Sequence, residues 1–185
     1  EALAPNTDRA YTGDLRYYRA WCKAALGRPL SYPVSVADVL RFIDDHTGGM
    51  TPEVDADLVE DGIKGRSGRH AVSTVRRRIL ALGRTHRLQD LASPGDNPAV
   101  KRALRWASMR AARNPAPRRK PITREILQAL LSTCEDTLRG RRDGALLLVA
   151  FASGGRRRSE VAVLEYHHLT GVVDGYLLRI HRSKT

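Results

Sequence analysis

The sequence predicts a mainly helical fold in two parts, and three observations support this prediction. Apolar residues recur every three or four positions through most of the chain, which is the spacing of amphipathic helices. The segment 114–121 (Asn-Pro-Ala-Pro-Arg-Arg-Lys-Pro) is rich in proline and basic residues, so it is expected to be a linker between residues 1–113 and 122–185. Close to the C-terminal end, Asp174-Gly175 lies between two apolar runs, which indicates a β-hairpin.

Three helices are predicted in the first 62 residues. The first runs from about 7 to 26, with an apolar stripe of Tyr11, Leu15, Tyr18, Cys22 and Leu26. The second follows Ser35, whose hydroxyl is expected to cap it, with Asp38 near its third position. The segment 51–62 is acidic and weakly periodic, and we expect a further helix there with poorly bounded ends.

Two basic helices are predicted next. A turn at 65–68 precedes a helix that ends at about 87, with Val72, Val75, Ile79 and Leu82 as its buried stripe. The opposite face of this helix is expected to hold His70, Ser73, Arg77 and Arg84. That composition favours contact with DNA phosphates and base edges, and the alternative is an exposed face without a partner. A second basic helix begins at Pro98, a position that suits the first turn of a helix.

The second part is predicted to contain three helices before the hairpin. Thr123 is expected to cap a helix that ends at about Cys134 and buries Ile126, Leu127, Leu130 and Leu131. The segment 142–153 is almost wholly apolar and is expected to lie inside the core. Gly154-Gly155 ends this helix, and helix is expected to resume over 156–165.

Composition excludes several classes of protein. The longest apolar run, 145–152, is shorter than the roughly 20 residues of a membrane span, and no segment resembles a signal peptide. The two cysteines, Cys22 and Cys134, form neither a disulfide framework nor a zinc site and are expected to be buried thiols. Phosphate-binding glycine loops and zinc-protease motifs are absent from these 185 residues.

Positive charge is concentrated in the middle of the chain. The net charge is +12, but residues 61–120 alone carry 16 basic and 3 acidic side chains, whereas residues 1–60 carry 6 and 10. A basic block of this kind is typical of a surface that binds a polyanion such as DNA. The alternative is a solvated helix face with scattered arginines.

The segment 153–160 (Ser-Gly-Gly-Arg-Arg-Arg-Ser-Glu) is the most specific stretch of the sequence. A helix that begins after a Gly-Gly break offers backbone N–H groups and arginines at one end, which suits a phosphate. With its apolar helix, glycine break and Arg-x-x-Glu spacing, this segment resembles the tyrosine recombinase (phage integrase) family. The resemblance assigns the first catalytic arginine to Arg157, with Glu160 in support, and the catalytic lysine of the following hairpin to Lys184 in Ser-Lys-Thr.

The resemblance extends over nearly the whole chain. It implies a SAM-like helical core-binding bundle over 1–113, a basic linker over 114–121 and the first portion of an α+β catalytic domain over 122–185. Members of this family cut and rejoin double-stranded DNA through a 3′-phosphotyrosyl intermediate without a metal or nucleotide cofactor, and they assemble as tetramers on DNA. The resemblance also implies a cytoplasmic, nucleoid-associated protein. The residues expected to contact DNA are Arg9 from the first helix and, from the basic block, His70, Ser73, Arg77, Arg84, Arg118, Arg119 and Lys120.

The sequence also departs from the family pattern. A His-x-x-Arg pair and a nucleophilic tyrosine beyond the lysine are missing, since all six tyrosines precede Lys184. The chain by itself is therefore expected to bind DNA without cutting it. Two alternatives are a non-enzymatic helical DNA-binding protein, such as a repressor, and an RNA-binding domain. The RNA-binding domain is disfavoured because aromatic residues make up only 5% of the chain.

Overall fold

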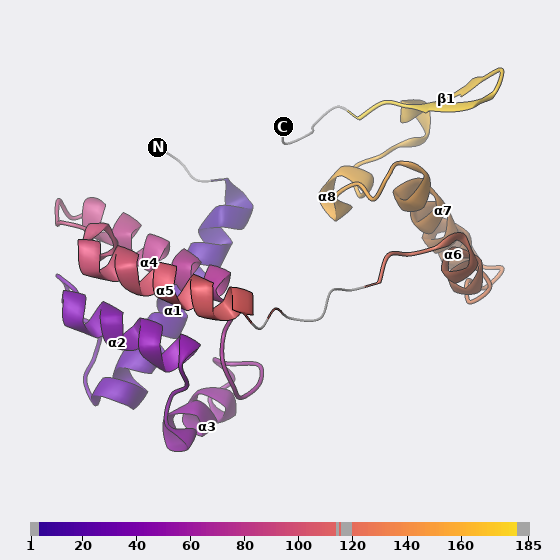
Figure 1. Ribbon diagram of the computed structural model, residues 1–185. Coiled ribbons are helices and arrows are strands. Elements are labelled where there is room, and N and C mark those ends of the chain that lie inside the picture. Colours follow the sequence, from indigo (N-terminus) through magenta and orange to yellow (C-terminus); the bar gives the residue numbers. More distant parts are fainter. Residues whose placement is uncertain (1–3, 114, 116–119, 181–185) are drawn as a thin grey trace. The chain divides into compact units, whose positions relative to one another are not determined.

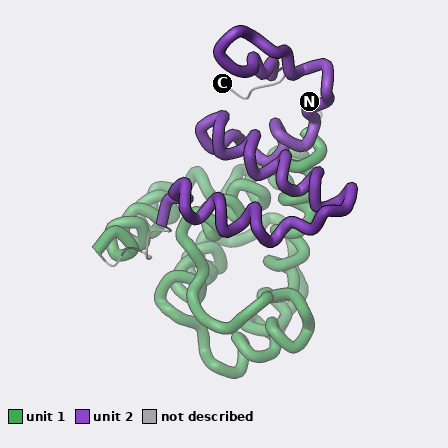
Figure 2. The backbone as a smooth tube through the Cα atoms, turned by 90° about the vertical axis from the view of Figure 1, so that its right-hand side faces the viewer, with its two compact units in different colours: residues 1–116 green, residues 117–185 purple. Residues whose placement is uncertain are grey.

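The computed structural model describes residues 4–113, 115 and 120–180, and it confirms a mainly helical fold with one small antiparallel hairpin (Figure 1). The chain divides into two compact units, residues 1–116 and 117–185 (Figure 2). The division falls within the proline-rich segment 114–121. No helix among the described residues is long and apolar enough to cross a membrane.

The first unit consists of five α-helices and one 3₁₀ turn among its described residues. They are α1 (Pro5–Leu26), α2 (Val36–Thr47), α3 (Pro52–Glu60), α4 (Val72–Arg87), η1 (Pro94–Asp96) and α5 (Pro98–Arg113). The predicted cap of α2 is confirmed, because the Ser35 hydroxyl accepts a hydrogen bond from the Asp38 N–H at 3.1 Å. Helix α1 begins at Pro5, slightly earlier than predicted, since a proline at the first helical position loses no hydrogen bond.

The core of the first unit is aromatic. Tyr18 and Trp21 of α1 lie against Phe42 of α2, with ring centroids 4.8 and 5.0 Å from that of Phe42. The indole N–H of Trp21 donates to Asp45 at 2.9 Å, so its one polar atom is satisfied. Helix α4 packs against α1, α2 and α5. Of its predicted stripe, Val75, Ile79 and Leu82 are buried, whereas Val72 is only partly buried. These contacts hold α4 with its opposite side exposed.

His70 does not lie on α4, so the prediction that it shares a helix face with Ser73 and Arg77 was wrong. The helix begins at Val72, after Ala71 as the capping residue. The backbone N–H of His70 donates to the carbonyl of His46 at 2.9 Å, which ties this residue to the end of α2. Tertiary bonds of this kind, which sequence periodicity does not reveal, keep residue 70 outside the helix.

The second unit contains α6 (Arg124–Leu131), α7 (Leu138–Ala152), α8 (Arg158–Val161), the 3₁₀ turn η2 (Tyr166–His168), β1 (Leu169–Val172) and β2 (Gly175–Leu178). The predicted hairpin is confirmed, with Leu169 paired to Leu178 and Val172 to Gly175. Its two-residue turn is Val173-Asp174, one position earlier than expected. Gly175 follows the turn with φ of +146°, which favours glycine.

Two predictions about burial in the second unit were wrong. The apolar run on α7 does not lie inside a core, because Leu146, Leu148 and Phe151 are each more than 40% exposed. On α6, Leu127 is buried, whereas Leu131 is only partly buried and Ile126 and Leu130 are exposed. Among the described residues, α7 packs against α6 and α8, and these two short helices cover only part of its apolar surface.

The helix predicted over 156–165 is much shorter than expected. Helix α8 ends at Val161, and a separate 3₁₀ turn begins at Tyr166. The Glu165 N–H donates to Nδ1 of His168 at 3.0 Å, a side-chain bond that starts this new turn. This bond gives the backbone at Glu165 a local alternative to helical hydrogen bonding. Cys22 is buried as expected, but Cys134 is only partly buried, and both are free thiols.

Candidate functional site

The outer side of α4 exposes the side chains predicted to meet DNA. Ser73 and Arg77 are exposed, and Arg84 is half-buried. Arg9 is exposed near the start of α1, and Lys120 is exposed in the segment 114–121. Arg118 and Arg119 lie outside the described residues. The structure therefore keeps four of the predicted basic side chains wholly or partly accessible to a ligand.

Arg77 is held by an acidic residue that the sequence analysis missed. Its Nε and Nη2 atoms donate to the two carboxylate oxygens of Asp14 on α1, at 2.7 and 2.9 Å. Hydrogen bonding to Asp14 raises the pKa of Arg77, while its side chain stays about half exposed. The pair fixes the direction of the guanidinium and joins α4 to α1. An acidic residue beside the apolar stripe of the first helix was the available signal for a buried partner.

Arg78 is the buried neighbour of Arg77 on α4. Its Nε lies 3.5 Å from the same Asp14, and its guanidinium carbon lies 3.2 Å from the centroid of the Tyr17 ring. Burial lowers the pKa of Arg78, and two of its nitrogens make no hydrogen bond within the described part of the chain. The carboxylate and the π-face of Tyr17 therefore compensate this buried charge.

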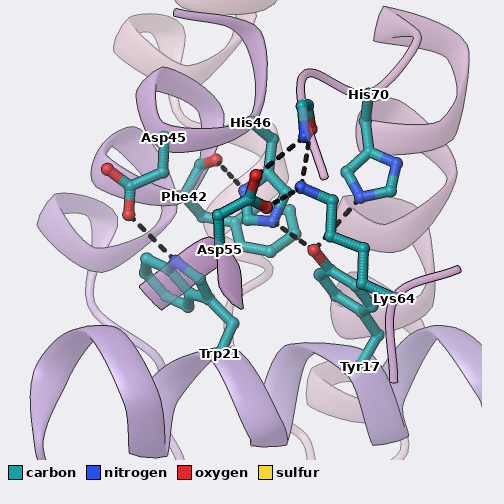
Figure 3. Close-up of polar contacts among 9 residues, drawn as sticks. Tyr17, Trp21, Phe42, Asp45, His46, Asp55, Lys64 and His70 are labelled. Atoms are coloured by element: carbon teal, nitrogen blue, oxygen red, sulfur yellow. Dashed lines mark hydrogen bonds and ion pairs between the residues drawn. The ribbon is translucent and has the colours of Figure 1, made fainter. Parts of the chain in front are cut away.

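A chain of buried and partly buried hydrogen bonds connects α1, α2 and His70 (Figure 3). Nδ1 of His46 donates to the Phe42 carbonyl at 2.7 Å, which leaves Nε2 as an acceptor for the Tyr17 hydroxyl at 2.9 Å. The Tyr17 oxygen then accepts from Nε2 of His70 at 3.1 Å. This assignment requires the His46 imidazole to be neutral, because its Nε2 atom accepts a hydrogen bond. His70 donates through Nε2 in either protonation state.

Burial determines the titration of this chain. It lowers the pKa of His46 to about 3 and that of His70 to about 4, helped by the nearby positive charges of Arg78 and Lys64. Burial raises the pKa of Tyr17 to about 12. All three groups are therefore uncharged at neutral pH, which agrees with the acceptor role of Nε2 in His46.

A buried ion pair fixes the turn that leads into α4. Lys64 is 4% exposed, pairs with Asp55 of α3, and donates to the Gly68 carbonyl at 2.6 Å. Asp55 also accepts the Gly68 N–H at 2.7 Å (Figure 3). Both ends of the predicted turn at 65–68 are thus tied to the helical body, which positions the first turn of α4.

In the second unit, the structure brings Arg157 and Glu160 together. Gly154 and Gly155 adopt φ values of +75° and +74°, a conformation that glycine accepts at little cost, and they end α7 sharply. Arg157 then caps α8, and its Nη1 lies 3.2 Å from Oε1 of Glu160. The other oxygen of Glu160 accepts the Arg157 backbone N–H at 3.4 Å. Glu160 is 6% exposed, whereas the Arg157 side chain is 58% exposed.

The arginine triplet separates into two directions. Arg156 and Arg158 line a cavity with Leu146, Leu147 and Val161, and Arg157 is not among the residues lining it. Arg157 instead pairs with the buried Glu160, which orients its guanidinium, and more than half of the Arg157 side chain stays accessible. This combination suits a guanidinium that binds a phosphate. Lys184 lies outside the described residues. Within the described part of the chain, no cluster of histidine, cysteine and carboxylate side chains is arranged to hold a metal ion.

Comparison with known proteins supports a relationship to DNA recombinases. No family model matches the chain. The chain is similar to an integrase/recombinase xerD homolog from Selenomonas ruminantium, with 30% identity over 188 aligned residues that include the whole chain. The chain spans about half (48%) of the length of this curated relative. The similarity therefore supports the relationship to the tyrosine recombinases that the Arg157 segment indicates.

Proposed function

We propose that the chain is the DNA-binding part and the first catalytic portion of a tyrosine recombinase. Residues 1–113 bind double-stranded DNA, and residues 122–185 supply Arg157, Glu160 and Lys184 to the reaction. The observation that carries this proposal is the pairing of Arg157 with the buried Glu160 directly after the double-glycine break. Similarity to an integrase/recombinase over the whole chain supports the same conclusion.

Electrostatics explains why an arginine suits this position. When a nucleophile attacks a phosphodiester, negative charge accumulates on the non-bridging oxygens of the crowded transition state. A guanidinium stays charged at every physiological pH and binds two such oxygens with parallel N–H groups. Glu160 accepts from Nη1 of Arg157 and from its backbone N–H, so the guanidinium is oriented before the substrate arrives.

Lys184 would have a different role in the same reaction. An ammonium group next to the scissile phosphate can donate a proton to the departing 5′-oxygen, whereas a guanidinium holds its proton too strongly. The nucleophilic tyrosine would come from outside this chain. Strand exchange of this type conserves the phosphodiester bond energy, because the leaving hydroxyl is replaced by another hydroxyl.

DNA contact is assigned to the first unit and the linker. Ser73 and Arg77 would approach a groove from α4, with Arg84 about two turns beyond Arg77. Arg9, Arg118, Arg119 and Lys120 would contact the backbone, and His70 would act from the segment before α4. Because Arg77 is already bound to Asp14, it would contact DNA through the exposed half of its guanidinium.

Replacement of Arg157 by alanine tests the proposed chemistry. In the whole protein encoded by the gene, we expect Arg157→Ala to lower strand cleavage by about 100-fold or more, because a fixed transition-state cation is lost. Affinity for duplex DNA should change little. Cleavage is measured on duplexes that the protein itself selects from a random pool, with denaturing gels that detect the covalent protein–DNA adduct.

Arg158→Ala is the matched control, since Arg158 is the adjacent arginine and lines a different cavity. It should retain near-normal cleavage. Equal cleavage by Arg157→Ala and the unaltered protein would contradict the assignment. Duplex binding by a whole protein that never forms a covalent adduct would instead favour a non-enzymatic DNA-binding protein.

A further inference from the structure

A second cavity is lined only by residues of the first unit, and it is basic. It has a volume of about 450 Å³ and is formed by the end of α2, the segment before α4 and the last turns of α5. Its lining includes Thr47, Arg69, His70, Val72 and Arg110. We call this cavity the basic pocket. Its volume falls within the range of pockets that hold small ligands.

We propose that the basic pocket binds one phosphate group of the DNA backbone. The proposal rests on the proposed DNA-binding function and deepens it by naming a contact that the sequence analysis did not assign. Arg69 and Arg110 approach the pocket from two segments that are distant in the sequence. Two guanidinium groups around one small cavity favour a ligand with several anionic oxygens, such as a phosphodiester.

The absence of carboxylates distinguishes these arginines from others in the same unit. None of the lining residues is acidic. Arg28, Arg77 and Arg78 pair with Asp38 or Asp14, whereas Arg69 and Arg110 take part in no ion pair within the described part of the chain. Their positive charge is therefore available to an external anion.

His70 gives the basic pocket a third donor. Its Nε2 is occupied by Tyr17, and its Nδ1 makes no hydrogen bond within the described part of the chain. An anion next to the ring stabilises the imidazolium form, in which Nδ1 becomes a donor. The charged groups around His70 are Arg78, Lys64, Asp55, Arg69 and Arg110, so positive charge dominates and an anion relieves it.

The position of the basic pocket favours DNA over a free anion. Ala71 and Val72 line it, and they are the cap and first residue of α4. Ser73 follows Val72 directly and is exposed. A backbone phosphate in the pocket would therefore place the adjoining groove of the DNA duplex alongside the outer face of α4. Backbone N–H groups in the first turn of α4, which has no side-chain cap, add to the two guanidinium groups.

Duplex binding by the chain tests the proposal. Affinity is measured by fluorescence anisotropy at several salt concentrations for the unaltered chain and for Arg69→Gln/Arg110→Gln. We expect the double variant to bind about tenfold more weakly or worse, by a similar factor on different sequences. The slope of log affinity against log salt should become shallower by about 1, as for the loss of one phosphate contact.

The matched control is Arg102→Gln/Arg105→Gln, which removes the same charge from exposed positions of α5 outside the basic pocket. It should bind more tightly than the pocket variant. Circular dichroism checks that both variants fold. Equal losses in the two double variants, or no loss in the pocket variant, would overturn the proposal and leave general DNA binding intact. If the unaltered chain binds no duplex, DNA binding and this assignment both fail.

Nuclear magnetic resonance of the His70 ring provides an independent measurement. Addition of duplex to the unaltered chain should raise the pKa of His70 from its low value, and the pocket variant should not show this rise. Inorganic phosphate alone, added at the same ionic strength, should produce a smaller rise. A His70 pKa that is unchanged by duplex, despite tight binding, would contradict phosphate in this pocket.

Discussion

Tyr17 and Tyr18 are adjacent buried tyrosines with opposite hydrogen-bond status. The Tyr17 hydroxyl connects His46 to His70, at 2.9 and 3.1 Å. The Tyr18 hydroxyl is buried and has no hydrogen-bond partner within the described part of the chain. Their aromatic rings both contact Phe42. Removing each hydroxyl therefore isolates the effect of the hydrogen bonds from that of the ring.

Tyr17→Phe should destabilise the first unit by about 1–3 kcal/mol, because it leaves the buried Nε2 of His46 without a donor. Tyr18→Phe is the control, and it should be neutral or slightly stabilising because it removes an unsatisfied polar atom. Urea unfolding, monitored by tryptophan fluorescence, measures the stability of both variants. A larger loss for Tyr18→Phe than for Tyr17→Phe would contradict the hydrogen-bond chain.

The buried histidines predict that stability depends on pH. In the folded chain the pKa is about 3 for His46 and about 4 for His70, both below the ordinary histidine value of 6.5. Between the folded and unfolded pKa values, the unfolded chain binds more protons than the folded chain. The contribution of the two histidines to stability is therefore fully present above about pH 6.5 and decreases as the pH falls. Each histidine contributes a slope of about 1.4 kcal/mol per pH unit.

Unfolding free energies measured between pH 5 and 7.5 check this dependence. The variant His70→Gln should retain the contribution of His46 and lose its own, so its profile should be shallower. Stability that stays constant from pH 7 to pH 5 would show that neither imidazole is buried in its neutral form.

At the scale of helices, two glycines of α1, one at its C-terminal end and one inside it, test the effect of backbone conformation on stability. Gly27 ends α1 with φ of +64°, and a Cβ at this position would meet no atom within 4 Å. Gly27→Ala should therefore lower stability by about 1–2 kcal/mol through backbone strain alone. Gly13→Ala, inside α1 and equally free of contacts, should raise stability by about 0.5–1 kcal/mol. Thermal unfolding that shows the same sign for both variants would contradict this account.

Elements governed by local interactions were predicted well from the sequence. The Ser35 cap of α2, the Thr123 cap of α6 and the hairpin after residue 168 all depend on neighbouring residues. His70 was misplaced because its bonds to His46 and Tyr17 join residues that are distant in the sequence. The burial of α7 was overestimated because an apolar run shows what a helix can bury, not which partners are available.

The candidate site was predicted unevenly for similar reasons. Arg157 and Glu160 lie three residues apart at a helix start, so their pairing follows from local geometry. The partner of Arg77 is Asp14, 63 positions away, and periodicity within each helix does not determine how the two helices align. Arg69 and Arg110 meet at one cavity only once α2, α4 and α5 are packed, so the sequence analysis missed them as a pair.

For the whole molecule, the central claim is that the basic middle of the chain binds duplex DNA. Residues 61–120 carry a net charge of +13, while the acidic side chains of the first 60 residues neutralise only part of it, as in the pair of Asp14 with Arg77. Binding of this kind releases counterions from the DNA, so affinity must decrease steeply with salt.

The affinity of the 185-residue chain for a 30-base-pair duplex, measured between about 50 and 300 mM salt, tests this claim most directly. We predict a log–log slope of about −4 or steeper, which corresponds to about five phosphate contacts. A slope near zero, or no measurable binding at about 50 mM salt, would contradict the assignment of the chain as a DNA-binding portion of a recombinase.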